Sequence, residues 1–447
     1  MRRLFLVILF VMPILAEDLH YISMHGQSLC LGTLGSPRLS ATQPYNNKRL
    51  ISSGAAVEPL TEGNTAATGF DNAESPASGM ANQLTFLSSG LTWNSLIDNN
   101  DCIGGAAYSV LKKGTAPYTA WLTAMHAAST TVAGLGSTFS YKGAIVIHGE
   151  TDFNNGVTAA AYAADLAEWR SNIASDVSAA YGPNAAPMLV SQMSTWSAYN
   201  ASQPLLCSYA ACNGIQERGV PLGQLDAARN NNGIYFLGPK YQYPYADSLH
   251  LTNQGYLQLG ELAGKVWKSL LIDHVYWTGL VPRSITSSGA TLTFQAWVPA
   301  GSLTIDTTTL ADATYCQGVS TADPAACTSG GGVWVYKGFE FYDSSGTAKA
   351  YITGAAITAS NTIAITLNKI PTGSNQRLRY AFTGAGKFPG GAATAPHGNI
   401  RDSDTAVGVT SGARLYNWLA TFDDPVGFSW APPSRGLFPL PSPRRQP

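Results

Sequence analysis

Residues 19–29, LHYISMHGQSL, join an apolar run to a polar turn, and this joint decides the fold of the first part of the chain. The apolar run 19–24 predicts a β-strand. Gly26 and Gln27 come directly after it, and a turn from strand to helix would expose the next residue, Ser28, at the carboxyl edge of a sheet. Open α/β sheets bind their ligands at that edge. We therefore expect Ser28 to face a binding crevice.

The pattern continues outward from this joint. Up to about residue 271, short apolar runs alternate with amphipathic helices, which is typical of a parallel sheet covered on both faces. One helix has apolar residues on a single stripe and is stopped by Gly182, and a later helix has Thr252 as its N-cap. The predicted strands are 19–24, 143–147, 188–193 and 233–237, and the predicted helices are 159–180 and 253–271.

The length of 447 residues indicates two domains, because single cores rarely grow beyond roughly 250 to 300 residues. Near WTGLVPRS, residues 277–284, the pattern changes to short runs that alternate apolar and polar residues, such as ATLTFQAWV and NTIAITLNKI. This alternation predicts an antiparallel β-sandwich. The predicted units are a signal peptide (1–16), an α/β domain (17–275), a β-sandwich domain (276–422) and a disordered, proline-rich tail (423–447).

The low charge of the chain and its N-terminal residues indicate which partners and which compartment to expect. Charged residues make up 12% of the chain and the net charge is −1, so no basic face is expected for nucleic acid. Arg2 and Arg3, an apolar run and Ala16 follow the order of a secretory signal. The run is too short to span a bilayer. We expect a secreted or periplasmic protein with no membrane span after cleavage; the alternatives are a buried first strand and an uncleaved anchor.

The chain has six cysteines, an even number that fits an oxidising compartment. Cys207 lies near Cys212, and Cys316 lies near Cys327, which would leave Cys30 with Cys102. Six cysteines allow 15 pairings, so the pairing stays open. No spacing matches a zinc site, and no metal is expected.

Asp247 and His250 stand in the string DSLH, three residues apart. A serine hydroxyl is a poor nucleophile until a base accepts its proton and a carboxylate orients that base. A single turn of chain can place Asp247 beside the His250 ring, so only Ser28 must be brought in by the fold. The alternative is a structural role, in which Asp247 caps a turn and Ser28 is an ordinary turn serine.

Three strings, in this order, resemble the SGNH hydrolase superfamily: GQS at 26–28, GETD at 149–152 and DSLHLT at 247–252, followed by Gly255 and Tyr256. Within it they are similar to the branch of sialate O-acetylesterase-like and acetylxylan esterase-like carbohydrate esterases. The resemblance covers roughly residues 19–271. It implies a flavodoxin-like, three-layer α/β domain in which Ser28, His250 and Asp247 form a catalytic triad. It implies no metal or organic cofactor.

The resemblance also implies three donors for an oxyanion. The first two are the Ser28 N–H and a glycine N–H, for which Gly105 is the first choice and Gly104 the alternative. The third donor is usually Asn or Gln in the family, but His148 stands here. A neutral imidazole can donate one hydrogen bond, so His148 is predicted as an oxyanion or substrate contact, with structural support of the site as the alternative.

Gln27, Glu150 and Asp152 belong to the same strings and are interpreted as supporting residues. A glycosidase pair must flank a sugar bond from opposite sides, which two residues so close in sequence do not. His25 stays uncertain and is taken as closer to structural. The remaining histidines are taken as structural or exposed: His20, His126, His274 and His397.

The resemblance implies a secreted esterase that removes O-acetyl groups from carbohydrate through an acyl-enzyme. One rival is a short-chain acyl esterase without sugar preference. Another is a carbohydrate-binding or surface-attachment protein whose hydrolase domain is vestigial. Aromatic residues of the second domain could stack on sugars, but packing in a sandwich explains at least half of them equally well: Trp297, Trp334, Tyr336, Phe339, Phe341 and Tyr342.

Overall fold

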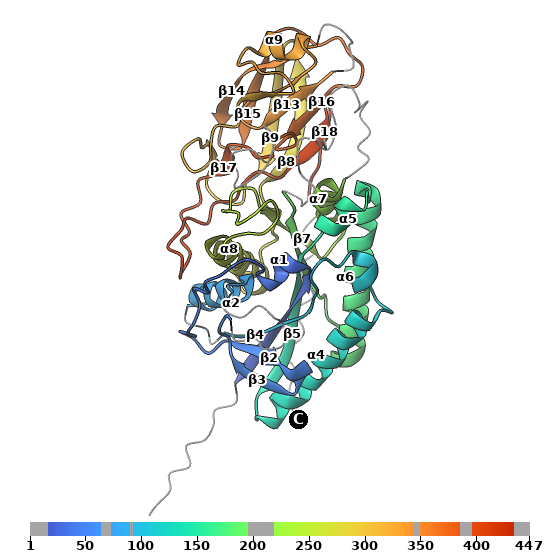
Figure 1. Cartoon of the computed structure of the whole chain (residues 1–447), viewed down its shortest axis with the longest axis vertical. Helices are drawn as coiled ribbons and strands as arrows, with labels where there is room; N and C mark the ends of the chain where they lie inside the picture. Colours follow the sequence, from blue (N-terminus) through green and yellow to red (C-terminus); the bar gives the residue numbers. More distant parts are fainter. Residues whose placement is uncertain are drawn as a thin grey trace, which may run out of the picture.

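The computed structural model describes residues 17–63, 73–89, 91, 93–194, 219–343, 349–384 and 396–432. An α/β part extends to about residue 275, and a sheet-rich part follows it (Figure 1). The predicted signal peptide, residues 1–16, lies outside the described residues. Within these ranges, no helix is both long and apolar enough to cross a bilayer.

The α/β part is built on one seven-stranded sheet with the order β3-β2-β4-β1-β5-β6-β7. β1 lies in the middle, parallel to β4 on one side and to β5 on the other. Only β3, at the edge, is antiparallel to its neighbour. Because the chain leaves β1 toward β4 and later continues toward β5, a crevice is expected at the carboxyl end of β1. The strands are β1 (Asp18–Gly26), β2 (Lys48–Ile51), β3 (Ala56–Pro59), β4 (Asn94–Cys102), β5 (Thr138–Ile147), β6 (Met188–Gln192) and β7 (Ile234–Pro239).

Helices cover both faces of this sheet. Figure 1 shows α2 and α8 on one side and α4 and α6 on the other. The three-layer arrangement buries the apolar strands between two helical layers. The helices are α1 (Ser28–Leu31), α2 (Pro76–Leu87), α3 (Tyr108–Leu111), α4 (Ala116–Gly134), α5 (Glu150–Asn154), α6 (Ala159–Tyr181), α7 (Val220–Asn230) and α8 (Asn253–Leu271), and a 3-10 turn lies at Ser52–Gly54.

The two helices predicted from the sequence are present. α6 ends at Tyr181, where Gly182 adopts a φ of +83°. α8 begins after Thr252, whose hydroxyl oxygen accepts the Gly255 N–H at 3.2 Å. Both predicted apolar stripes are buried: Tyr162, Leu166, Trp169, Ile173 and Val177 in α6, and Leu259, Leu262, Val266 and Leu270 in α8.

β4 and the β2–β3 hairpin are absent from the sequence prediction. β4 carries Asp98 and Asp101, and aspartate is depleted in strands. Both side chains are buried, and each has a partner on β1. The Tyr21 hydroxyl donates to Asp98, and His25 Nδ1 lies 2.7 Å from Asp101 Oδ2. These hydrogen bonds across the sheet compensate the free-energy cost of burying the two carboxyl groups of β4.

The sheet-rich part consists of antiparallel strands, as the alternation predicts. A four-stranded sheet, β14-β15-β9-β8, and a three-stranded sheet, β13-β16-β18, meet through Phe294. Its ring stacks on Phe422 and meets Phe339 edge-on, with centroids 5.6 Å apart in both pairs. The elements are β8 (Val281–Ser288), β9 (Thr291–Trp297), β10 (Leu303–Ile305), β11 (Tyr315–Gln317), α9 (Pro324–Ser329), β12 (Val333–Val335), β13 (Phe339–Tyr342), β14 (Ile352–Ala359), β15 (Thr362–Leu367), β16 (Arg377–Tyr380), β17 (Ile400–Asp402) and β18 (Phe422–Pro425).

Three of the six aromatic residues considered for sugar stacking lie in the core of this part, and three are half-buried. Burial removes the ring faces from any ligand, so core packing accounts for the first group. The buried residues are Phe339, Phe341 and Tyr342. The half-buried residues are Trp297, Trp334 and Tyr336.

The predicted disordered tail begins too early. β18 extends to Pro425 and pairs with β16, and Trp430 Nε1 donates to the Arg229 carbonyl at 3.1 Å. The string FDDP reads as polar, but Arg377 Nε lies 2.6 Å from Asp423 and compensates its charge. The chain is therefore packed as far as residue 432, and residues 433–447 lie outside the described residues.

Buried polar contacts join the two parts. The Gln192 side chain, at the end of β6, donates to the Thr421 carbonyl at 2.9 Å and accepts the Thr421 N–H at 2.8 Å. Arg229 of α7 donates to both carboxylate oxygens of Asp424, at 3.1 and 2.9 Å. Such bidentate pairs fix orientation as well as distance. The two parts are held in one relative position by these bonds.

Disulfides join Cys30 to Cys102 and Cys316 to Cys327. The first links α1 to the end of β4, and the second closes a short loop in the sheet-rich part. Cys207 and Cys212 lie outside the described residues. In the described part of the chain, no group of three or more His, Cys, Asp or Glu side chains is placed to hold a metal ion.

Candidate active site

Ser28 is the first residue of α1, and only Gln27 separates it from the end of β1. Gly26 makes this turn possible. Its φ is +149°, and a Cβ there would lie 2.1 Å from the Ile147 carbonyl oxygen, so only glycine fits. Ser28 consequently lies at the carboxyl edge of the sheet, with 9% of its surface exposed.

His250 and Asp247 lie on the loop between β7 and α8. His250 Nε2 is 2.8 Å from Ser28 Oγ, and His250 Nδ1 is 2.9 Å from Asp247 Oδ2. An isolated bridge between Tyr245 and Leu251 closes this loop, and α8 begins directly after it. The fold therefore brings the three predicted residues into one continuous hydrogen-bonded chain.

The environment of Asp247 favours its charged form. Its Oδ1 accepts the N–H groups of Leu249 at 2.7 Å and of His250 at 2.5 Å. Partial burial by itself would raise the pKa of the Asp247 carboxyl, but the hydrogen bonds from the His250 ring and from these N–H groups outweigh it and hold the pKa below its ordinary value. A charged Asp247 keeps the ring proton on Nδ1. Nε2 is then free to accept the Ser28 proton.

Two backbone N–H groups are candidates for binding an oxyanion. The Ser28 N–H begins α1 and so has no acceptor within its own helix. Gly105 has a φ of +71°, and no heavy atom lies within 4 Å of the place that a Cβ would occupy. Its carbonyl accepts the Thr151 hydroxyl at 3.1 Å, which fixes the orientation of this peptide. Gly104, the alternative, also borders open space.

The strand ends that carry these groups are tied together. The Ile103 N–H donates to the Gly26 carbonyl at 2.9 Å, so the segment before Gly105 continues along the end of β1. The disulfide between Cys30 and Cys102 adds a covalent link between α1 and the same segment. Both cysteines are buried. This disulfide therefore constrains α1 relative to the glycine segment.

The prediction of His148 as an oxyanion donor is wrong for this structure. The side chain is fully buried, with Nδ1 2.7 Å from the Tyr162 hydroxyl and Nε2 2.9 Å from the Ala106 carbonyl oxygen. A neutral ring that donates from Nε2 and accepts at Nδ1 has no N–H left for a substrate. His148 instead holds the residue after Gly105, which agrees with the alternative of a supporting role.

The other supporting residues connect the same loops. Gln27 Oε1 accepts the Thr151 N–H at 3.3 Å. Asp152 accepts the first N–H of α3 at 3.0 Å. Glu150 Oε1 lies 2.9 Å from Lys240 Nζ, and both side chains are almost completely buried. A paired, buried carboxylate is poorly placed to reach a substrate, and these contacts order the loop beside Ser28.

A second Ser–His–Asp group, which was not predicted from the sequence, lies in the core. His25 Nε2 is 2.8 Å from Ser23 Oγ, and His25 Nδ1 is 2.7 Å from Asp101 Oδ2. The Ser23 hydroxyl is also 3.1 Å from the Tyr141 hydroxyl. Ser23, His25 and Asp101 are all completely buried. The signal was that Ser23 and His25, two apart on one strand, share a face of the sheet.

Comparison with known proteins shows similarity of fold without a sequence match. No protein-family model matches the chain, and no curated protein sequence matches it. The crystal structure of a carbohydrate acetylesterase from Xanthomonas citri is similar over 91% of this chain and 80% of that chain, with a TM-score of 0.53 and 13% sequence identity. This chain shares the fold of that structure.

Two further solved structures are similar to part of the chain. A protein from Arabidopsis thaliana is 15% identical, and the similarity covers 57% of this chain and 98% of that chain with a TM-score of 0.43. NanS is 13% identical, and the similarity covers 58% of this chain and 100% of that chain, also with a TM-score of 0.43.

Proposed function

We propose that the chain is a secreted serine esterase of the SGNH type that removes O-acetyl groups from carbohydrate. The observation that carries the proposal is the hydrogen-bonded chain from Ser28 through His250 to Asp247, at 2.8 and 2.9 Å. Apart from β3 and β2 at one edge, the strands β4-β1-β5-β6-β7 follow the order 2-1-3-4-5 of flavodoxin-like sheets. The shared fold with a carbohydrate acetylesterase supports an acetylated sugar as the substrate.

In the first half of the reaction, Ser28 Oγ attacks the carbonyl carbon of the ester while His250 Nε2 takes its proton. The negative Asp247 carboxylate stabilises the imidazolium that forms. The carbonyl oxygen becomes an oxyanion and accepts hydrogen bonds from the Ser28 and Gly105 N–H groups. The tetrahedral intermediate collapses, the bond to the sugar oxygen breaks, and that oxygen takes the proton from His250.

In the second half, water attacks the acetyl group on Ser28. His250 Nε2 accepts a proton from this water, and the N–H groups of Ser28 and Gly105 again hold the oxyanion. When the acetyl–Ser28 bond breaks, His250 returns its proton to Ser28 Oγ, and acetic acid leaves and loses its own proton to water. Within the site, every proton moves between His250 and an oxygen, so this scheme uses only groups of the chain, the ester and water.

Secretion is part of the proposal. The predicted signal peptide and the two disulfides, Cys30–Cys102 and Cys316–Cys327, support it because disulfides persist in oxidising compartments. Sequencing the N-terminus of the exported protein tests this part, and we expect it to begin at Glu17. Retention of the protein inside the cell would contradict it.

Covalent labelling tests the nucleophile. A serine-reactive fluorophosphonate should modify Ser28 and no other serine, and peptide mapping by mass spectrometry should place the label within residues 25–33. Ser28→Ala should remove the label. A label on a different peptide, or no label on folded protein, would contradict the proposed mechanism.

Comparing substrates tests the sugar preference. Release of acetate from acetylated xylan or acetylated sialic acid should have a higher kcat/KM than hydrolysis of p-nitrophenyl acetate, whose leaving group is intrinsically better. A generalist esterase would show no gain from the sugar. Binding of glycan without any turnover would instead support a vestigial hydrolase.

A further inference from the structure

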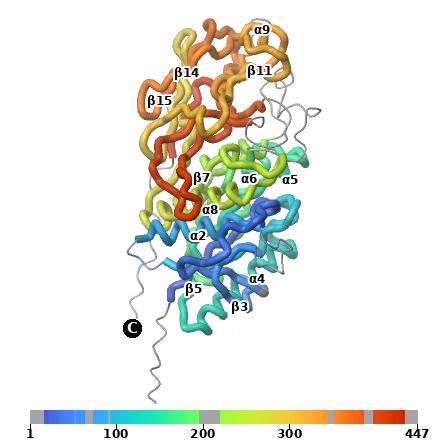
Figure 2. The backbone as a smooth tube through the Cα atoms, turned by 60° about the vertical axis from the view of Figure 1, so that its left-hand side comes forward, coloured from blue at the N-terminus to red at the C-terminus, as the bar shows by residue number. Residues whose placement is uncertain are grey.

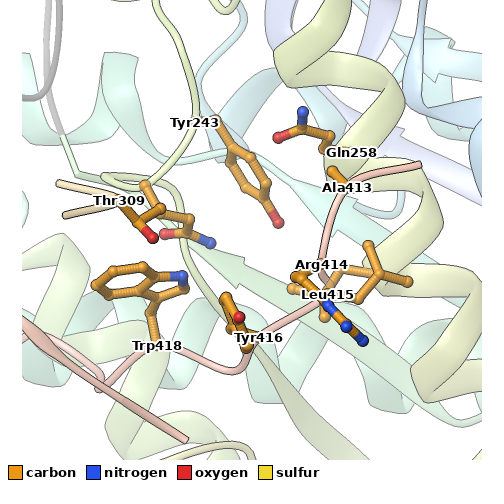
Figure 3. Close-up of a pocket in the computed structure, with 10 residues that line it drawn as sticks. Tyr243, Gln258, Thr309, Ala413, Arg414, Leu415, Tyr416 and Trp418 are labelled. Carbon is orange, nitrogen blue, oxygen red and sulfur yellow. The ribbon is translucent and has the colours of Figure 1, made fainter. Parts of the chain in front are cut away.

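A cavity of about 350 Å³ lies where the sheet-rich part meets the α/β part. Figure 3 shows Tyr243 and Gln258 on one side and Arg414, Tyr416 and Trp418 on the other. Tyr243 belongs to the loop after β7, Gln258 belongs to α8, and the last three residues belong to the segment between β17 and β18. The volume is within the range of small-molecule sites.

The lining of this cavity has an apolar floor and a polar rim. Tyr243, Leu262 and Trp418 are buried, with exposures of 5%, 2% and 3%. Gln258 and Tyr416 are half-buried, and Arg414 is exposed. A sugar ring has the matching chemistry, because its C–H faces pack on aromatic rings and its hydroxyl groups bond to side-chain amides and guanidinium groups.

The charge of the lining favours an acidic ligand. Arg414 is the single charged side chain among the described residues that line the cavity. Its Nη1 donates to the Thr405 carbonyl at 2.5 Å, and the side chain is exposed, so its other N–H groups can be reached by a ligand. A guanidinium binds a carboxylate through paired hydrogen bonds. A sugar that carries a carboxylate would therefore fit better than a neutral one.

The segment that closes the cavity is anchored on α8. Glu261 Oε1 accepts the N–H groups of Thr410 at 2.7 Å and of Ser411 at 2.9 Å. Lys265 Nζ donates to Asp404 at 2.9 Å and to the Leu415 carbonyl at 2.5 Å. Figure 2 shows this C-terminal segment in red against α8. The cavity is therefore built before any ligand arrives, which lowers the entropic cost of binding.

The same elements lead from this cavity to Ser28. The loop after β7 carries Tyr243 and then Asp247 and His250, and α8 begins after Thr252. Gln258 follows Thr252 by six residues, which is about 9 Å along a helix. The loop that carries Asp247 and His250 therefore connects the lining of the cavity to the Ser28 group.

We propose that this cavity is a glycan subsite that binds a sugar residue away from the ester, with preference for a sugar that bears a carboxylate. The assignment rests on the proposed function for its substrate class, but it concerns residues that take no part in the acyl transfer. The half-buried Tyr416 packs against the sugar ring, Gln258 bonds the hydroxyl groups of the sugar, and Arg414 pairs with the carboxylate.

Calorimetric titration of the whole chain with unacetylated oligosaccharides tests this subsite. The probes are a xylotriose that carries a glucuronic acid branch and the same xylotriose without it. We expect the glucuronate probe to bind about tenfold more tightly, and Arg414→Gln to remove this difference. Gln258→Ala should weaken both probes. Gln254→Ala, an exposed residue one turn earlier on α8, is the matched control and should bind like the wild type.

Three outcomes would overturn the assignment: no binding of either probe, binding that Gln258→Ala and Arg414→Gln leave unchanged, or equal binding of the two probes by the wild type. Melting temperatures of all variants show whether each is folded. Fluorophosphonate labelling of Ser28 separates this test from that of the proposed function. A labelled protein that binds no sugar refutes the subsite alone, and an unlabelled protein that binds sugar refutes the esterase alone.

Discussion

The chain contains two Ser–His–Asp groups with almost the same distances and different surroundings. In the group of Ser28, the serine and histidine are 2.8 Å apart, and the histidine and aspartate are 2.9 Å apart. In the group of Ser23, the same distances are 2.8 and 2.7 Å. Distances within the group therefore do not distinguish a candidate active site from a core network.

The surroundings of the two serines differ in three ways. Ser28 lies at the sheet edge beside Gly105 and open space, whereas Ser23 is completely buried. The Ser23 hydroxyl has a second partner, the Tyr141 hydroxyl at 3.1 Å. Finally, Ser28 begins a helix, so its N–H has no acceptor within that helix, whereas Ser23 lies inside β1. The buried group of Ser23 therefore lacks both access for a substrate and N–H groups that could bind an oxyanion.

The largest expected effect is that of removing each hydroxyl in turn. Ser28→Ala should lower kcat for p-nitrophenyl acetate by about 10⁴-fold or more, because the nucleophile is lost. Ser23→Ala is the matched control. It should keep its activity and lose about 1–3 kcal/mol of unfolding free energy, because the buried hydrogen bonds to His25 and Tyr141 are removed. Equal activity of the two variants would contradict the assignment of Ser28, and not Ser23, as the nucleophile.

The two aspartates should separate activity from stability. Asp247→Asn should reduce kcat by about 10²- to 10⁴-fold, because the His250 ring takes the wrong tautomer, with little change in melting temperature. Asp101→Asn should reduce the unfolding free energy by about 1–3 kcal/mol and leave the folded protein active. Urea unfolding and ester hydrolysis on the same samples check both. Loss of activity in folded Asp101→Asn would mean that the buried group reaches the reaction.

The two disulfides give a smaller contrast. Replacing Cys30 and Cys102 by Ser should lower kcat about tenfold, since small displacements of catalytic groups reduce the rate strongly. Replacing Cys316 and Cys327 by Ser is the control, and it should affect stability alone. Each removal should cost about 2–4 kcal/mol. If both double variants keep full kcat, the link beside Ser28 does not position the site.

The smallest effect concerns pH. Burial raises the pKa of Asp101, although the His25 side chain opposes this, whereas the hydrogen bonds of Asp247 overcome its burial and lower its pKa. The stability contributed by Asp101 should fall as pH rises above its ordinary pKa of about 3.9. That of Asp247 should be present above about pH 3.9 and be lost as pH falls. Urea unfolding of Asp101→Asn and Asp247→Asn between about pH 3 and 6 should give opposite slopes relative to wild type.

Local patterns predicted much of the fold and the position of the Ser28 group. Period-3.6 stripes locate α6 and α8, and the strand–glycine–serine joint locates Ser28 at the sheet edge. Asp247 and His250 are close in sequence, so their contact needed only one loop. These features depend on neighbouring residues, which a single sequence displays.

Features that depend on distant partners were missed or misjudged. The aspartates of β4 suggest a loop until Tyr21 and His25 on β1 are known to face them. His148 looked available as a donor until the fold placed Tyr162 and the Ala106 carbonyl against its two nitrogens. In both cases the sequence shows the polar group but not the partner that satisfies it.

The interface between the two parts has a consequence for how the protein denatures and how it can change in evolution. If the sheet-rich part were lost, Arg229, Gln192 and Lys265 would lose their hydrogen-bond partners. Their side chains would then lie on a surface of the α/β part that is now covered. The apolar side chains of the same interface would then face water, which costs about 25 cal/mol for each Å² of apolar surface exposed. We expect one cooperative calorimetric transition for the whole chain, and a lineage that deletes either part must redesign the other.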